Sequence, residues 1–332
     1  MPRYDGSRGL RVITAQLVTT IIPVYNRGAM LVEAVDSVLA QTHRPIEIVI
    51  VDDGSTDDTG AVANGLASRH AEIRVIRQAN GGVGAARETG RLAARGEFIQ
   101  HLDSDDLLYP RKFELQVAGL LADPSAGASY GWTRMRHLDG SLDPKPWKRT
   151  GEVIAAMFPA FLESRWWETS TPLFRADVIR QAGPWTTLQT EEDWEYDCRV
   201  ASLGTRLHYC PEWIAEKREH GVDQLSRPTP ERLQSVFRDR SEAHRLIFGH
   251  SVRAGVSADV PEMRHFAREL FLLARQCGAI GLPRESEMLF RLAREASGPE
   301  SKRLQFRLYG ALARALGWPA AGRIAGLMDR LR

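Results

Sequence analysis

The chain has 332 residues, of which 43% are hydrophobic and 26% are charged, and its net charge is +2. These values are typical of a globular protein with enough apolar material for a full core. No uncharged apolar run is long enough to cross a bilayer, which excludes an integral membrane protein, and the three widely spaced cysteines imply no disulfide framework.

The N-terminal segment and the cysteines bear on the location of the protein. Residues 1–12 are polar and lack the apolar core of a secretory signal. Cys198, Cys210 and Cys277 show no metal-ligand spacing and fit a reducing compartment. We therefore expect a cytoplasmic protein, with a peripheral position at the inner face of the plasma membrane as the alternative.

Short β-branched runs alternate with apolar residues at helical spacing along the first third of the chain. Strands are predicted at 17–24, 46–51, 73–76 and 97–102. Helices are predicted at 30–39, 61–68 and 81–94. Polar clusters follow the strand ends, so the pattern predicts an open, mostly parallel α/β sheet. Ligands bind such sheets beyond the carboxyl ends of the strands.

The rest of the chain predicts a mixed segment and then a helical region. A strand at 127–135, a helix at 192–201 and a strand at 206–209 are expected. The sequence 227–230, Arg-Pro-Thr-Pro, predicts a boundary, which gives a catalytic domain at 1–226 and a basic helical region at 227–332. Amphipathic helices are expected near 231–248, 262–277, 284–297 and 301–316.

Charge is distributed unevenly between these two regions. From Arg227 onward the chain holds 19 Lys+Arg and 11 Asp+Glu, a net charge of +8, while the part before it has a net charge of −6. This asymmetry predicts that the second region faces something anionic. An anionic membrane surface or a lipid-linked acceptor fits the amphipathic helices. The alternative is that their apolar faces pack on the catalytic domain or on a second copy in a homo-oligomer.

The strongest chemical signal is the cluster Asp103-Ser104-Asp105-Asp106 at the end of the fourth predicted strand. Three carboxylates repel one another, and Mg²⁺ or Mn²⁺ takes oxygen ligands that it shares with substrate phosphates. An EF-hand is excluded because Leu107 breaks the ligand ladder. The alternative is a solvated turn with helix-capping aspartates.

Polar and glycine-rich clusters follow the other predicted strands. The cluster Asp52-Asp53-Gly54-Ser55 ends the second strand, where one of the two aspartates accepts hydrogen bonds from a nucleobase or ribose, or the cluster is a capped turn. Tyr25 follows the first strand and either stacks on a base or is an ordinary half-buried aromatic. The glycines at 81–84 permit close approach of an anion to a helix start, and Arg87 one turn later faces a diphosphate in this interpretation.

Further candidates lie in the second half of the chain. The cluster 191–194, Glu-Glu-Asp-Trp, opens a predicted helix and supplies either favourable helix-terminal charge or a general base for an acceptor hydroxyl. His220 is a metal or phosphate contact, or a structural histidine. Trp166 and Trp167 stack on an acceptor sugar or belong to the core.

Taken together and in this order, five stretches resemble the family 2 glycosyltransferases of the A-type nucleotide-sugar fold. The resemblance covers about residues 17–225 and is carried by TTIIPVYNRG, SVLAQTHRPIEIVIVDDGSTDDT, GGVGAARETG, GEFIQHLDSDDLLYP and TEEDWEYDCRVASLG. It implies the inverting transfer of a sugar from a nucleotide-diphosphate donor, a UDP- or dTDP-sugar, to a hydroxyl of a saccharide or lipid-linked acceptor. It also implies Mn²⁺ or Mg²⁺ as cofactor, and no nucleic acid is expected as a partner.

The resemblance implies roles for individual residues. Tyr25 is similar to the aromatic residue that stacks on the base, Asp53 to the one that reads the uracil or thymine edge, and Asp193 to the catalytic base. Donor contacts are expected from Pro23, Tyr25, Asn26, Asp53, Arg87, Asp103 and Ser104. Metal contacts are expected from Asp105, Asp103 and His220. Weaker acceptor contacts are expected from Glu192, Trp194, Trp166 and Trp167.

Two rival functions belong to other classes. A sugar-nucleotide nucleotidyltransferase uses a related sheet, but it needs a glycine-rich basic loop directly after the first strand, where this chain has Pro-Val-Tyr-Asn-Arg at 23–27. A non-catalytic scaffold would keep the fold and use the helical region for assembly. The full set of acidic residues argues against the scaffold.

Overall fold

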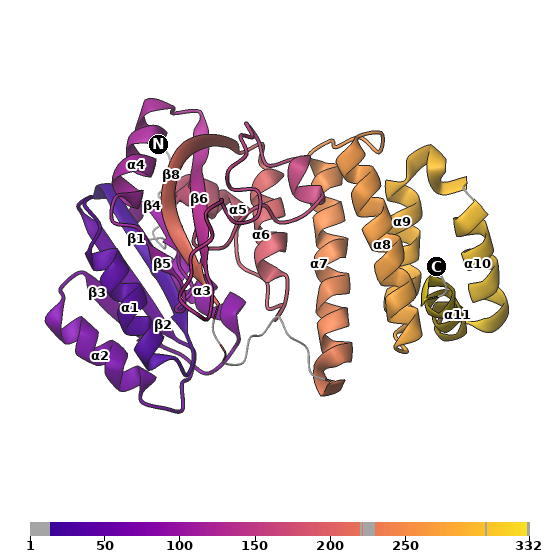
Figure 1. The fold of residues 1–332 in the computed structure, drawn as a ribbon, viewed down its shortest axis with the longest axis horizontal. Helices are drawn as coiled ribbons and strands as arrows, with labels where there is room; N and C mark the ends of the chain where they lie inside the picture. The colour runs from indigo at the N-terminus through magenta and orange to yellow at the C-terminus, as the bar shows by residue number, and fades with distance from the viewer. Residues whose placement is uncertain (1–13, 220, 222–229, 303, 331–332) are drawn as a thin grey trace, which may run out of the picture. The chain divides into compact units, whose positions relative to one another are not determined.

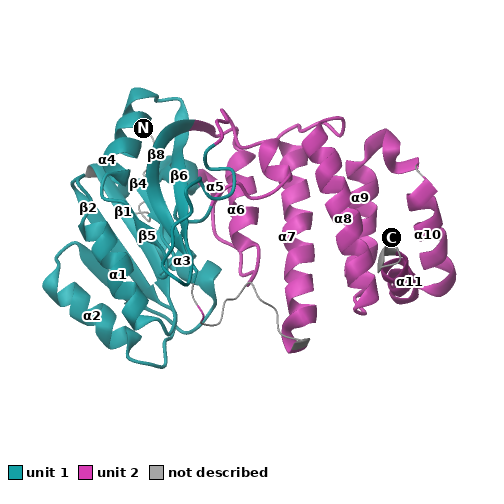
Figure 2. Ribbon diagram, in the orientation of Figure 1, with its two compact units in different colours: residues 1–151, 168–180, 208–219 teal, residues 152–167, 181–207, 220–332 magenta. Residues whose placement is uncertain are grey.

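The structure is a computed structural model that describes residues 14–219, 221, 230–302 and 304–330. The chain divides into two compact units, which Figure 2 distinguishes by colour. Unit 1 comprises residues 1–151, 168–180 and 208–219, and unit 2 comprises 152–167, 181–207 and 220–332. The boundary residues predicted at 227–229 lie outside the described residues, so the division at 226/227 stays a prediction.

An eight-stranded open sheet forms the centre of unit 1, and Figure 1 labels its strands except β7. Its order is β3-β2-β1-β4-β7-β6-β8-β5. The strands are β1 Thr14–Val24, β2 Ile46–Asp52, β3 Ile73–Arg77, β4 Gly96–His101, β5 Leu107–Leu108, β6 Ala126–Arg136, β7 Leu173–Arg175 and β8 Arg206–Arg218.

The sheet is mixed. β1 pairs in parallel with β2 and β4, and β2 pairs in parallel with β3, which confirms the parallel half predicted from the sequence. β7 runs antiparallel to β4 and β6, and β5 runs antiparallel to β8. The prediction of a mostly parallel sheet therefore holds for the first four strands but not for the other half.

Helices cover both faces of the parallel half, as the apolar strand sequences require. Ile48 and Ile50 of β2 join the main core with Leu31 of α1, whereas Val49 and Val51 pack with the other face. The helices of this unit are α1 Gly28–Leu39, α2 Thr59–Arg69, α3 Val83–Ala93 and α4 Lys112–Ala122. Because β1, β2, β3 and β4 run in the same direction, their carboxyl ends lie at one edge of the sheet, where the polar clusters follow.

Unit 2 is mainly helical, and a short helix, α5 Ala176–Ala182, crosses from one unit to the other. The predicted helix at 192–201 is confirmed as α6, and the C-terminal helical region is present. Its helices are α7 Leu233–Arg253, α8 Pro261–Ala279, α9 Pro283–Ala296, α10 Leu304–Leu316 and α11 Trp318–Arg330. The last of these was not predicted. In the described residues, none of the helices combines the length and the apolar character needed to cross a bilayer.

Candidate functional site

The loops that follow β1 and β2 are bonded to each other through Asn26. Its backbone has a φ of 52°, the left-handed region that asparagine tolerates. The Asn26 amide donates to Ser55 Oγ at 3.0 Å, and the Thr56 amide donates to Asn26 Oδ1 at 2.8 Å. Tyr25, one residue earlier, is 44% exposed, whereas Pro23 is buried within β1. The fixed loop thus presents the Tyr25 ring to solvent.

Asp53 connects the end of β2 to the glycine-rich turn before α3. Its carboxylate accepts hydrogen bonds from Gln78 Nε2 at 2.8 Å, from the Gly81 amide at 3.0 Å and from the Gly82 amide at 2.8 Å. Gly82 has a φ of 87°, which favours glycine there. Asp53 therefore supports the turn, and its Oδ2, which accepts one of these bonds, retains acceptor capacity for a further donor.

Two arginines compensate the carboxylates that follow β4. Arg87, in the first turns of α3, is buried and donates from Nη2 to Asp103 Oδ1 at 2.7 Å. Arg27, directly after Asn26, forms an ion pair with Asp105. The loops after β1 and β4 and the first turns of α3 thus meet at one edge of the sheet. Arg27 is not among the residues predicted for the site, although it lies inside the PVYNRG stretch.

Asp106 is the buried member of the acidic cluster. It accepts hydrogen bonds from the Arg218 amide at 3.2 Å and from Ser170 Oγ at 3.3 Å, and Lys217 Nζ lies 4.0 Å from its Oδ1. Burial raises the pKa of Asp106 to about 8, although the Lys217 charge acts in the opposite direction. No sequence signal had pointed to Lys217, Arg218 or Ser170, because the pairing of β8 beside β5 brings the two basic residues to the cluster.

The carboxylates of the cluster are close enough together to share a cation. Oxygen atoms of Asp103, Asp105 and Asp106 all lie within 4.8 Å of one another. A set made only of carboxylate oxygens suits hard divalent cations such as Mg²⁺ and Mn²⁺. Ser104 is buried in the same turn. His220, the third metal ligand expected from the sequence, lies outside the described residues.

The acidic group of unit 2 lies at the start of α6. Arg165 donates from Nη1 to Asp193 Oδ2 at 2.5 Å and from Nε to Asp197 Oδ2 at 2.7 Å. The Asp193 side chain is 28% exposed, whereas Asp197 is buried. The Asp193 carboxylate also accepts a hydrogen bond from the Trp194 amide at 2.7 Å. Its orientation is therefore fixed from two sides.

The neighbours of Asp193 have structural partners. Glu191 pairs with Arg240 at 2.8 Å and with His244 at 3.1 Å. Burial raises the pKa of Glu191. The hydrogen bond with His244 and the charges of His244 and Arg240 lower this pKa by more in total, so its net shift is downward. Glu192 is buried. Asp193 has the most exposed side chain of these three residues. The side chain of Glu191, in contrast, is paired with Arg240 and His244 of α7.

The tryptophans considered for an acceptor sugar are packed inside unit 2. Trp166 is 3% exposed and Trp167 is fully buried, and both rings pack against Phe161. Trp194 donates from Nε1 to the Phe161 carbonyl at 2.8 Å and meets His244 edge to face. Neither ring has an exposed face, so the structure supports the alternative interpretation that Trp166 and Trp167 are core residues.

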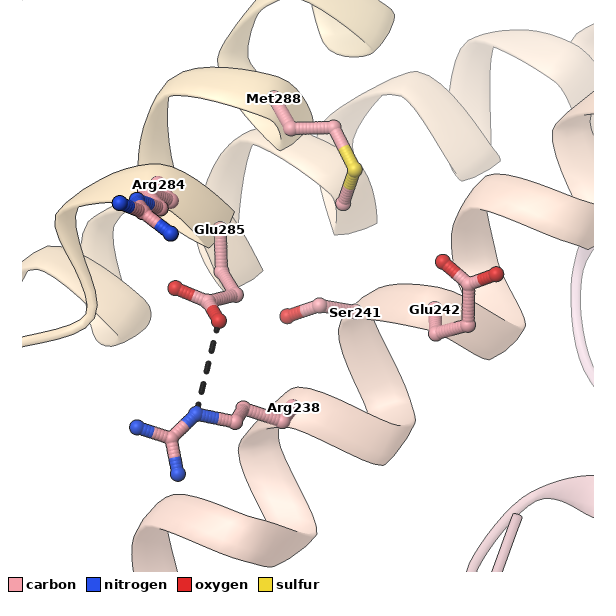
Figure 3. Close-up of a pocket in the computed structure, with 6 residues that line it drawn as sticks. All are labelled: Arg238, Ser241, Glu242, Arg284, Glu285 and Met288. Atoms are coloured by element: carbon pink, nitrogen blue, oxygen red, sulfur yellow. Dashed lines mark ion pairs between the residues drawn. The ribbon is translucent and has the colours of Figure 1, made fainter. Parts of the chain in front are cut away.

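A separate hollow of about 260 Å³ lies between α7 and α9 in unit 2 (Figure 3). Arg238 and Glu285 face each other across it, with Nε and Oε1 3.5 Å apart. Its other lining residues are Ser241, Glu242, Arg284 and Met288. None of the residues predicted for the site lines this hollow, and its two arginines are balanced by two glutamates.

Comparison with known proteins places the first half of the chain in a family. Residues 19–174 match the model of Glycosyl transferase family 2. The uncharacterized glycosyltransferase EpsJ of Bacillus subtilis is 47% identical over 98 residues, 30% of this chain and 28% of the relative. The chondroitin synthase of Escherichia coli is 35% identical over 158 residues, 45% of this chain and 23% of the relative. The chain thus matches less than a third of the length of either relative.

Solved structures share the fold. TarS 1-349 of S. aureus, in complex with UDP-GlcNAc, has a TM-score of 0.68 at 17% identity and covers 95% of this chain and 91% of its own. The mannosyltransferase PcManGT of Pyrobaculum calidifontis, in complex with GDP-Man and Mn²⁺, has a TM-score of 0.51 at 19% identity, with 95% and 86% covered. The expected A-type sheet with flanking helices and a helical C-terminal region is therefore confirmed, and the segment 19–174 is similar to Glycosyl transferase family 2.

Proposed function

We propose that this protein transfers a sugar from a UDP- or dTDP-sugar to a hydroxyl of a saccharide or lipid-linked acceptor, with inversion at the anomeric carbon. The observation that carries the proposal is the carboxylate cluster at the end of β4, held by Arg27 and Arg87 within a family 2 domain. Such a combination of acidic ligands and cations suits a diphosphate with its metal.

The donor is assigned to the loops at the carboxyl edge of the sheet. The exposed ring of Tyr25 stacks on the base, and Asp53 accepts from the base edge while it holds the glycine turn. Arg27 and Arg87 pair with Asp105 and Asp103. A guanidinium has five N–H groups, so an arginine that donates to an aspartate can also donate to a diphosphate.

The cofactor proposed is Mn²⁺ or Mg²⁺, held by Asp105 and Asp103, with Asp106 as the buried third carboxylate. When bound, such a cation compensates the negative charge of the nucleoside diphosphate leaving group. The oxygen-only donor set described above fits it. The contribution of His220 stays a prediction from the sequence.

Asp193 is proposed as the general base. It takes the proton of the acceptor hydroxyl while that oxygen forms a bond to the anomeric carbon, and the bond from this carbon to the diphosphate oxygen breaks on the opposite face. Its partial exposure and its fixed orientation between Arg165 and the Trp194 amide support this choice over Glu191 and Glu192. No covalent enzyme intermediate is formed.

A thermal-shift screen tests the donor assignment. Nucleotide sugars with different bases and sugars are added to the protein with and without Mn²⁺, and a tight donor raises the melting temperature by mass action. We expect the largest rise with a uridine or thymidine diphosphate sugar in the presence of metal. No rise with any nucleotide sugar would contradict the proposal.

A further inference from the structure

The last two helices of unit 2 are apolar on two opposite faces. The inner face of α10 is buried through Phe306, Tyr309 and Ala313. The Phe306 ring lies 4.8 Å from Phe271 between centroids, and the Tyr309 ring lies 5.6 Å from Phe290. These aromatic contacts determine which side of α10 turns inward.

The inner face of α11 is determined by a close glycine contact. Gly322 packs so tightly on α8 that a Cβ added there would lie 2.3 Å from the Ala279 amide nitrogen and 2.6 Å from the Gly278 carbonyl carbon. Ala321 and Ala325 are buried beside it. A rotation of α11 about its axis would bring larger side chains into this contact, so the opposite side of the helix must face outward.

The outward sides carry large apolar residues instead of polar ones. Leu304 and Leu308 of α10 are 66% and 61% exposed, and Leu327 and Met328 of α11 are 61% and 57% exposed. Leu304 and Leu308 are four residues apart and Ile324 and Leu327 are three apart, so each pair lies on one side of its helix. Leu316 and Met328 lie at the border with the buried side. We call this set the terminal apolar face; its members are Leu304, Leu308, Leu316, Ile324, Leu327 and Met328.

Positive charge borders the terminal apolar face. Arg307, Arg314 and Arg323 are exposed on the same two helices, and α10 contains no acidic residue. Within the described part of the chain, none of these three arginines forms an ion pair with a carboxylate. An apolar stripe bordered by arginines that have no carboxylate partner complements a membrane surface, in which anionic head groups cover apolar acyl chains.

We propose that the terminal apolar face docks on an anionic phospholipid surface. The leucines, Ile324 and Met328 enter the boundary between head groups and acyl chains, and the three arginines contact the phosphates. Neither helix crosses the bilayer, so the attachment is peripheral and reversible. The inference concerns membrane attachment alone and does not depend on the glycosyl transfer proposed above.

Vesicle flotation with the whole protein tests this inference. Vesicles of phosphatidylcholine alone are compared with vesicles that contain about 30% phosphatidylglycerol, at about 50 mM and about 500 mM NaCl, since salt shortens the reach of surface charge. We expect flotation with the anionic vesicles at low salt and a marked decrease at high salt. Each arginine replaced by serine is expected to weaken partitioning roughly fivefold, which corresponds to ~1 kcal/mol per charge.

Paired variants locate the contact. Leu308→Glu combined with Leu327→Glu should abolish flotation, whereas Val252→Glu on α7, where the native residue is 52% exposed, should leave it unchanged. Thermal unfolding checks that the variants fold. If the double glutamate variant does not fold, flotation of the arginine variants tests the proposal instead. The proposal is overturned if the parent does not float with anionic vesicles, if Val252→Glu abolishes flotation as well, or if sedimentation shows that the face joins two copies of the chain.

Discussion

Arg165 holds Asp193 in place: its Nη1 lies 2.5 Å from Asp193 Oδ2, while its Nε bonds the buried Asp197 at 2.7 Å. The Arg165 side chain is only 9% exposed, and Trp167 donates to the same Asp197 oxygen at 3.0 Å. The guanidinium thus connects a partly exposed carboxylate to the core of unit 2. In the proposed reaction it acts as a positioning residue for the base.

Arg165→Lys should lower kcat by about tenfold or more while the donor KM changes little. A lysine ammonium keeps the charge but lacks the planar fork that bonds both aspartates at once. Steady-state kinetics with a saturating acceptor measures the effect. An equal rise in donor KM without a loss of kcat would mean that Arg165 serves binding and not the orientation of Asp193.

Asp105→Asn should abolish the response to metal and leave the fold intact. The substitution removes one charge from the group that holds the cation, whereas the side chain keeps its size. The increase in melting temperature on addition of Mn²⁺ is compared between the parent and this variant. Asp139→Asn, at an exposed turn of unit 1, is the matched control and should respond as the parent does. Full activity in excess chelator would contradict the metal assignment.

Tyr25→Ala and Asp53→Ala should separate nucleotide affinity from stability. Loss of the exposed Tyr25 ring should weaken UDP binding by roughly 5- to 30-fold, about 1–2 kcal/mol of stacking, without lowering the melting temperature. Asp53→Ala should lower both, because Gln78, Gly81 and Gly82 lose their acceptor. A buried donor left without a partner costs about 1–3 kcal/mol. Calorimetry and thermal unfolding on the same samples test this, and unchanged UDP affinity in both variants would place the base elsewhere.

Glu195 should make unit 2 sensitive to acid. Burial raises the pKa of this carboxyl, but the hydrogen bonds from His250 and Arg199 lower it more, so that the net shift is downward from 4.5. A lowered folded-state pKa means that the stabilisation is present above pH 4.5 and is lost as the pH falls through the folded value. Thermal unfolding between about pH 3 and pH 7 should therefore show a steeper acid loss in the parent than in Glu195→Gln. Parallel curves for the two proteins would contradict this role.

Local patterns in the sequence were enough to predict the parallel half of the sheet. The runs at 46–51 and 97–102 became β2 and β4 almost unchanged. The run at 46–51 is mostly apolar because a strand buried on both faces needs such residues. The helix at 192–201 was likewise predicted to the residue, since acidic side chains mark its first turn.

The antiparallel half depends on contacts that no local pattern reveals. β7 has only the residues Leu173–Arg175, too few for a periodic signal, and it becomes a strand because β4 and β6 lie on either side of it. The same holds for the site. The acidic cluster was visible in the sequence, but its partners Lys217 and Arg218 lie more than 110 residues away and reach it only through β8.

Arg165 was missed for a similar reason. It precedes two tryptophans that drew attention as sugar-stacking candidates, and no spacing connects it to Asp193. The burial of Trp166 and Trp167 beside it shows that this segment forms the core that supports the proposed base.

The most direct test of the proposed function follows the leaving group. The protein is incubated with Mn²⁺, an acceptor mixture and the nucleotide sugar selected by thermal shift, and the release of nucleoside diphosphate and of pyrophosphate is measured separately. We expect nucleoside diphosphate only, with a rate that falls by about 10²-fold or more in Asp193→Asn and much less in Glu192→Gln. Pyrophosphate release would indicate a nucleotidyltransferase, no release above a protein-free control would indicate a scaffold, and an undiminished rate in Asp193→Asn would contradict the assignment of the base.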